Sequence, residues 1–121
     1  MSTAALVVVA LVGLLHVYIL VLEMFLWDKP QGLKAFGLTP QQAAQTKVLG
    51  ANQGLYNGFL AAGLFWGLYL GGPQGRHVMT FFLVCVLVAG VYGAATANKR
   101  ILFIQAVPAA IGLILLFLSG V

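Results

Sequence analysis

Charged residues are scarce in this sequence, which has two acidic and six basic side chains among 121 residues and is 62 % hydrophobic. Soluble domains carry about 25 % charged residues, so the composition excludes an ordinary soluble fold and predicts an integral membrane protein. The single cysteine, Cys85, permits no internal disulfide. No histidine and cysteine cluster, glycine-rich phosphate loop or haem-attachment motif occurs. We therefore expect no metal and no cofactor.

Four long apolar segments dominate what is present. They cover about residues 4–27, 48–71, 78–97 and 101–120. Each has around 20 residues or slightly more, and about 20 residues at 1.5 Å each span the hydrocarbon core of a bilayer. Their apolar residues are continuous rather than alternating, which favours helices. The sequence predicts an all-α fold, an integral membrane four-transmembrane-helix bundle forming a single domain.

The only sizeable predicted loop covers residues 28–39. At its end, Thr39 has the character of a helix N-cap, Pro40 suits the first helical position, and Gln42 suits the reciprocal capping-box position. The second helix is therefore predicted over about 40–71. Its first two turns should lie outside the membrane, because the apolar stretch begins only at about residue 48.

The basic residues predict the orientation of the chain. Five lie either between the first and second apolar segments or between the third and fourth, and only Arg76 lies between the second and third. The excess of positive charge in cytoplasmic loops then makes loop 28–39 cytoplasmic and leaves both termini outside. The net charge of +4 is explained by this topology and by contact with anionic membrane lipid, rather than by nucleic acid.

Two ionisable residues, His16 and Glu23, interrupt the first apolar segment. They are seven residues apart, so they project from one face of a helix with an axial separation of roughly 10 Å. An ionisable side chain in hydrocarbon costs on the order of 3 kcal/mol or more. This face should therefore look into the bundle, and we predict His16 and Glu23 as candidate catalytic residues.

Other polar side chains come to a similar depth on the second and fourth helices. The candidate ligand-binding residues are Asn52, Gln53, Tyr56, Asn57 and Gln105. Together with His16 and Glu23 they predict a polar pocket in the cytoplasmic half of the membrane. Structural alternatives remain for each: His16 as a donor to a carbonyl or to Asn57, Glu23 paired with Lys99 or Arg100, and the amides as links between helices.

Small residues repeat every four positions on the second helix, at Gly50, Gly54, Gly58 and Ala62. Such a stripe lets another backbone approach closely. We predict that its partner is the small-residue face of the third helix, at Ala89, Gly93 and Ala97. On the fourth helix Pro108 removes a backbone hydrogen bond and predicts a kink.

The segments HVYILVLEMFLW, NQGLYNGFLAAGLFWG and FIQAVPAAIGL resemble recurring segments of a small bacterial four-helix membrane family catalogued only as a domain of unknown function. The resemblance covers nearly the whole chain. It implies the topology above and a multi-pass location in the bacterial inner membrane, and it brings no activity or cofactor. Small multidrug-resistance transporters are similar in length and in having one glutamate in the first helix, but here His16 is additional.

These observations lead to one preferred hypothesis for function and two alternatives. The preferred hypothesis is a pocket that binds a small lipophilic or amphipathic molecule from the inner leaflet, with acid and base chemistry as a further option. The first alternative is a proton-coupled transporter working as a homodimer. The second is a structural subunit whose glycine stripe docks to a larger membrane complex.

Overall fold

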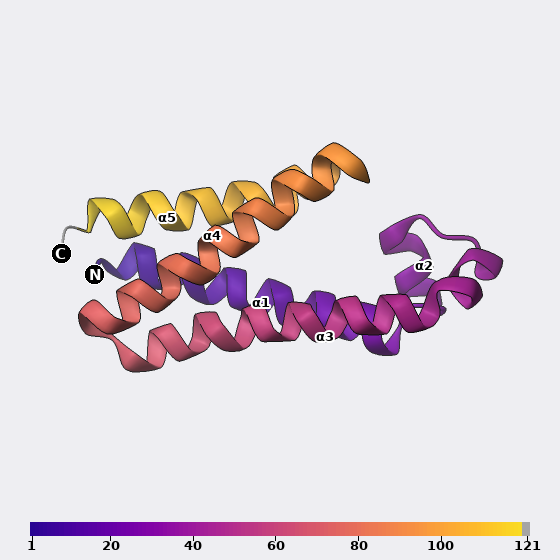
Figure 1. The fold of residues 1–121 in the computed structure, drawn as a ribbon, viewed down its shortest axis with the longest axis horizontal. Coiled ribbons are helices and arrows are strands. Elements are labelled where there is room, and N and C mark those ends of the chain that lie inside the picture. Colours follow the sequence, from indigo (N-terminus) through magenta and orange to yellow (C-terminus); the bar gives the residue numbers. More distant parts are fainter. Residues whose placement is uncertain (120–121) are drawn as a thin grey trace. The chain divides into compact units, whose positions relative to one another are not determined.

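The computed structural model of the protein describes residues 1–119, and its regular structure is helical. The helices are α1 (Thr3–Phe25), α2 (Pro30–Phe36), α3 (Pro40–Leu70), α4 (Gly72–Thr96), the π-helical segment η1 (Leu102–Ala106) and α5 (Val107–Leu118) (Figure 1). No strand occurs in this part of the chain, so the all-α prediction is confirmed. Helices α1 and α4 are long and apolar enough to cross a membrane, and residues 102–118 form a shorter apolar helix.

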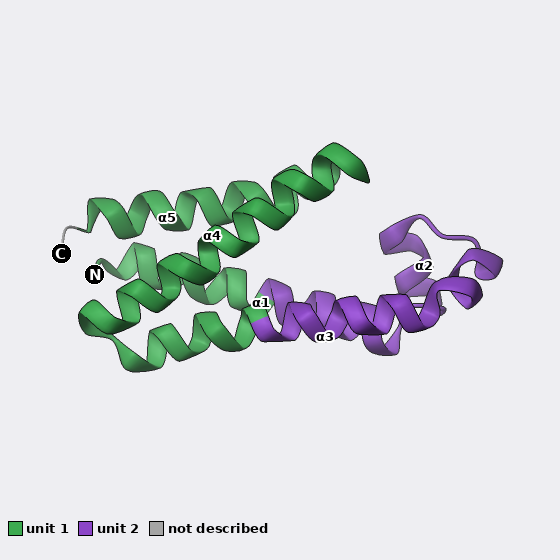
Figure 2. Ribbon diagram, in the orientation of Figure 1, with its two compact units in different colours: residues 1–14, 60–121 green, residues 15–59 purple. Residues whose placement is uncertain are grey.

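The chain divides into two compact units, coloured separately in Figure 2. Unit 1 comprises residues 1–14 and 60–121, and unit 2 comprises residues 15–59. Helices α1 and α3 therefore contribute residues to both units. Each unit is described by itself below.

The core of unit 1 is built from one narrow stripe on each helix. Its buried members are Ala5, Val9, Val12, Leu64, Met79, Leu83, Val86, Ala109 and Leu116. On α1 and α4 these positions recur at intervals of three and four residues, which places them on one helical face. Large apolar side chains also cover the outward faces, and many of them are exposed.

A tight turn joins α3 to α4 within unit 1. Gly71 and Gly72 have φ values of 61° and 58°, a conformation that glycine adopts without steric cost. A Cβ atom on Gly75 would lie 2.4 Å from the carbonyl oxygen of Gly67, so the two backbones approach too closely for a side chain. Because α4 begins at Gly72, Arg76 and His77 are helical, whereas the sequence suggested a loop there.

The last apolar segment is divided by its proline. Pro108 has no N–H, and its ring would clash with the carbonyl of Ile104 in a regular α-helix. The chain forms a π-helical turn just before it, in which the N–H of Val107 donates to the oxygen of Leu102. The predicted disturbance at Pro108 thus takes the form of a π segment. The predicted end of this helix at residue 120 lies outside the described residues.

In unit 2, the segment predicted as a loop contains the short helix α2. The ring of Trp27 lies 4.9 Å from that of Phe36, and its Nε1 donates to Thr46 Oγ1 at 3.1 Å. A Cβ on Gly32 would lie 1.9 Å from the carbonyl oxygen of Leu26. The packing of α2 onto the end of α1 therefore requires glycine at position 32, and it holds Trp27 in a buried position.

The predicted start of the second helix is confirmed in detail. The N–H of Thr39 donates to Gln42 Oε1 at 3.0 Å, and the N–H of Gln42 donates to Thr39 Oγ1 at 3.1 Å. Pro40 is the first residue of α3. This reciprocal capping box satisfies two backbone donors that a helix start otherwise leaves open.

An ion pair joins the turn between α1 and α2 to α3 in unit 2: Lys47 Nζ donates to Asp28 Oδ2 at 3.0 Å. This hydrogen bond lowers the pKa of Asp28 below its ordinary value. The ionised group therefore stabilises the fold at neutral pH, and that contribution is lost as the pH falls through the lowered pKa.

We expect Asp28→Asn to remove this acid-range dependence while changing stability little at neutral pH, since the pair is solvent-exposed and screened by salt. Thermal unfolding of parent and variant between about pH 6 and pH 2 at low salt measures the difference. Lys34→Gln, which removes an exposed lysine on α2, is the control. Parallel curves for parent and Asp28→Asn over this range would contradict the assignment.

Candidate functional site

The two ionisable residues predicted on the first helix are both buried in unit 2. The side chains of His16 and Glu23 are 0 % and 4 % exposed. Both belong to α1, which is otherwise apolar. Burial of a carboxyl group on such a helix is costly unless it has a polar partner.

That partner comes from α3. Asn57 Nδ2 donates a hydrogen bond to Glu23 Oε1, and Asn57 itself is half-buried. The sequence had suggested Asn57 as an alternative partner for His16. The structure pairs it with Glu23, which links α1 and α3 through a carboxyl group and a neutral amide.

Glycines on α3 create the close approach that makes this bond possible. A Cβ on Gly54 would lie 2.6 Å from Met24 Cγ and 2.9 Å from Glu23 Cβ, and one on Gly58 would lie 2.6 Å from Leu20 Cδ1. Gly50 faces the ring of Trp27 in the same way. Within unit 2, α1 therefore covers Gly54 and Gly58, and Trp27, which follows α1, covers Gly50.

This corrects the predicted partner of the stripe, which was the third apolar segment. The small residues of α4 pack elsewhere in unit 1: a Cβ on Gly90 would lie 2.7 Å from the backbone nitrogen of Ala106, and one on Gly93 would lie 3.2 Å from Ile101 Cγ2. Ala89 and Ala97 are exposed. A small-residue stripe shows that a backbone can come close, but it does not specify which neighbour comes.

Three predicted binding residues of α3 lie on its exposed side. Asn52, Gln53 and Tyr56 are exposed, and Asn52 Nδ2 donates to the carbonyl of Val48 on its own helix at 2.9 Å. Among the described residues, no hydrogen bond joins any of the three to Glu23. Gln105 belongs to unit 1, where it is half-buried on the π segment η1.

The site in unit 2 thus consists of Glu23 and Asn57, with His16 two helical turns away on the same face of α1. Sequence reasoning did not single out Leu20 and Met24, which pack against the glycines of α3 beside this pair. The stripe did name Gly54, and Asn57, three positions after it, lies on nearly the same face of the helix.

The chemistry of this pair follows from its donors and acceptors. A carboxylate offers about four lone-pair positions, and a carboxylic acid adds one donor. The amide of Asn57 occupies one of these positions. The pair can therefore receive a hydroxyl, amine or amide donor, and the carboxyl group can exchange a proton with it.

Comparison with known proteins gives one family and one relative. The family described as "Protein of unknown function (DUF1304)" matches residues 10–117. The chain is also similar to "Uncharacterized protein YpaA" of Lactococcus lactis subsp. lactis (strain IL1403), with 28 % identity over 107 residues, 87 % of this chain and 89 % of the relative. No solved structure matches the chain. The family match covers every predicted site residue.

Proposed function

The chain belongs to the DUF1304 family, as the resemblance of its segments predicts. The description of that family assigns no activity, so we propose a function from the site itself. The protein is a multi-pass protein of the bacterial inner membrane. It binds the polar group of a small lipophilic or amphipathic molecule at Glu23 and Asn57, and Glu23 exchanges a proton with that group. The observation that carries this proposal is a carboxyl group, 4 % exposed, on an apolar helix with a neutral amide as its partner.

Membrane insertion is supported by the apolar helices and by the side chains they expose. Helices α1 and α4 have the length and composition of spans, and large apolar residues such as Leu11, Phe81 and Phe117 are exposed on α1, α4 and α5. Lipid contact removes these surfaces from water. In the proposed four-span arrangement, α3 and the η1–α5 segment supply the other two spans.

The orientation makes a direct prediction about two exposed glutamines. Gln31 lies on α2, in the proposed cytoplasmic segment, and Gln74 lies at the start of α4 on the opposite side. In a Cys85→Ser background, Gln31→Cys should resist an impermeant thiol reagent in intact cells while Gln74→Cys is labelled. Labelling at position 31 without labelling at position 74 would show that the orientation is the opposite of the one proposed.

The binding role rests on the cost of the buried carboxyl group. An ionisable residue inside a membrane is expensive and is a functional hypothesis by default. Asn57 satisfies one of its lone pairs, so the group has capacity for a ligand. His16, buried on the same face of α1, is proposed as the second group that flanks the bound molecule.

The packing of the glycine stripe bears on the alternative in which the protein is a structural subunit. That alternative needs the stripe to be free for a neighbouring protein. In unit 2 the stripe is occupied by Leu20, Met24 and Trp27 of the same chain. This packing favours the binding proposal over the subunit alternative, because the three glycines already have a partner within the chain.

Mass spectrometry of molecules that copurify with the protein tests the binding proposal. The parent, washed at about pH 5 and about pH 8, should retain a specific amphiphile in a pH-dependent amount. Glu23→Gln keeps the shape and removes the titrating group, so retention should lose its pH dependence and fall by about tenfold. Asn52→Ala removes an exposed amide of α3 and is the matched control.

The same retained molecules at the same pH dependence in parent and Glu23→Gln would overturn the proposal. Retention that falls equally in Glu23→Gln and Asn52→Ala would overturn it as well, since the loss would then not belong to Glu23. Circular dichroism of each variant confirms that the helices are intact.

A further inference from the structure

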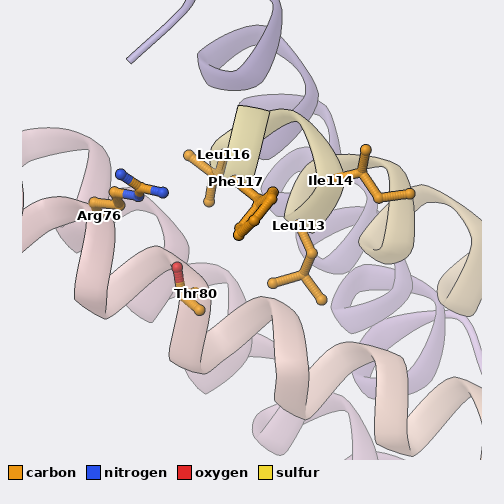
Figure 3. Close-up of a pocket in the computed structure, with 6 residues that line it drawn as sticks. All are labelled: Arg76, Thr80, Leu113, Ile114, Leu116 and Phe117. Carbon is orange, nitrogen blue, oxygen red and sulfur yellow. The ribbon is translucent and has the colours of Figure 1, made fainter. Parts of the chain in front are cut away.

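Unit 1 contains a pocket where the start of α4 faces the end of α5 (Figure 3). Its volume is about 380 Å³, and it is lined by Arg76, Thr80, Leu113, Ile114, Leu116 and Phe117. Small-molecule sites have volumes of about 300–1,000 Å³. The pocket shares no residue with the Glu23 site.

The polar wall of this pocket is supplied by α4. Arg76 and Thr80 are four residues apart, so they lie one above the other on the same helical face. Figure 3 shows the guanidinium of Arg76 and the hydroxyl of Thr80 on the side of α4 that faces α5. Both side chains are half-buried. Arg76 offers the paired N–H donors of its guanidinium, and Thr80 offers a hydroxyl one helical turn later.

Arg76 has no acidic side chain in its unit to balance its charge. The chain contains two acidic residues, Glu23 and Asp28, and both belong to unit 2. There they are hydrogen-bonded to Asn57 and Lys47. The first turn of α4 also carries no acidic residue, although the N-terminal end of a helix favours negative charge. An anionic group from outside the chain would supply the counter-charge that the side chains of unit 1 lack.

The opposite wall is apolar and belongs to α5. Leu116 is buried, while Ile114 and Phe117 are 57 % and 77 % exposed. A hydrocarbon chain bound here would cover these apolar side chains. A small hydrophilic anion would leave them exposed to solvent. The best-fitting occupant therefore carries an anionic group at one end and an acyl chain at the other.

We propose that this pocket is a binding site for an anionic phospholipid. The phosphate accepts hydrogen bonds from the Arg76 guanidinium and from the Thr80 hydroxyl, in the bidentate manner that guanidinium and phosphate favour. The acyl chain lies along Leu113, Ile114 and Phe117. The site is independent of Glu23, so its test does not depend on the function proposed above.

Native mass spectrometry of the purified full-length protein, with defined lipids added, tests the site. The probes are palmitoyl-oleoyl phosphatidylglycerol, which is anionic, and palmitoyl-oleoyl phosphatidylcholine, which has the same chains and no net charge. We expect the parent to bind phosphatidylglycerol at least about tenfold more tightly. Arg76→Gln should lower that affinity about tenfold, and Thr80→Val should lower it a few-fold.

Arg100→Gln is the matched control, because it removes the same charge from an exposed position of the same unit. It should leave binding of phosphatidylglycerol unchanged. Equal losses in Arg76→Gln and Arg100→Gln, or equal affinity of the parent for the two lipids, would overturn the proposal. Displacement of the lipid by millimolar inorganic phosphate would also overturn it, because the site would then recognise the free anion without its acyl chain. Thr80→Val keeps the test informative if Arg76→Gln does not fold.

Discussion

Gly54→Leu is expected to destabilise the protein severely, by about 3 kcal/mol or more, because its side chain has no space to occupy. A Cβ at this position already meets Met24 Cγ at 2.6 Å and Glu23 Cβ at 2.9 Å, and the carbonyl oxygen of Leu20 is 3.2 Å away. A leucine would separate α3 from α1 and break the bond between Asn57 and Glu23. Thermal unfolding in detergent, followed by circular dichroism, measures the loss.

Two substitutions nearby serve as controls. Leu55→Ala shortens a side chain that is 41 % exposed, so it should cost less than about 1 kcal/mol. Ala62→Leu places the same side chain at the last position of the four-residue repeat, where the alanine is exposed, and it should be nearly neutral. A melting temperature for Gly54→Leu equal to that of the parent, or a loss as large for Ala62→Leu, would show that the glycine stripe is not a packing surface.

Features that depend on neighbouring residues in the sequence were predictable. The capping box of Thr39 and Gln42 is one example, since both of its hydrogen bonds are made within four residues. The disturbance before Pro108 is another, because it follows from the missing N–H and the shape of the ring. Each depends on local geometry alone.

Features that depend on tertiary packing were not predictable. Helix α2 contains Gly32 in a short segment that also begins with proline, and these residue types argue for a loop. It forms because Phe36 stacks beside Trp27 and because Gly32 fits against the carbonyl of Leu26. The partner of the glycine stripe was mistaken for the same reason.

The candidate site shows which geometric argument was missing. Depth along the membrane normal placed Asn52, Tyr56 and Asn57 in the same half of the membrane, but direction around the helix axis separates them. At about 100° per residue, Asn52 and Tyr56 point to the side of α3 opposite Gly54, whereas Asn57 lies about 60° from Gly54. Gly54 marks the face that contacts α1, so Asn57 is the amide that reaches Glu23. The sequence gives the direction of Asn57 relative to Gly54, but it does not show that α1 is the neighbour on that face.

The bond between Asn57 and Glu23 leads to the second large expected effect, which a double-mutant cycle measures. Asn57→Leu has similar volume but removes the amide that donates to the buried carboxyl group. We expect a cost of about 2 kcal/mol, because a buried acceptor loses its partner. Glu23→Leu should cost less, because the half-buried amide of Asn57 can turn toward other acceptors.

The double variant Glu23→Leu/Asn57→Leu separates a structural role from a functional one. Replacing both members of a buried polar pair by apolar groups of similar shape is often neutral or stabilising. We expect the double variant to regain most of the stability lost in Asn57→Leu, which is a coupling of about 1 to 2 kcal/mol in the cycle. Costs that simply add would mean that the two side chains do not act as a pair. The double variant can also be as stable as the parent and yet no longer retain the copurifying molecule. That result would show that the carboxyl group is needed for ligand binding and not for the fold.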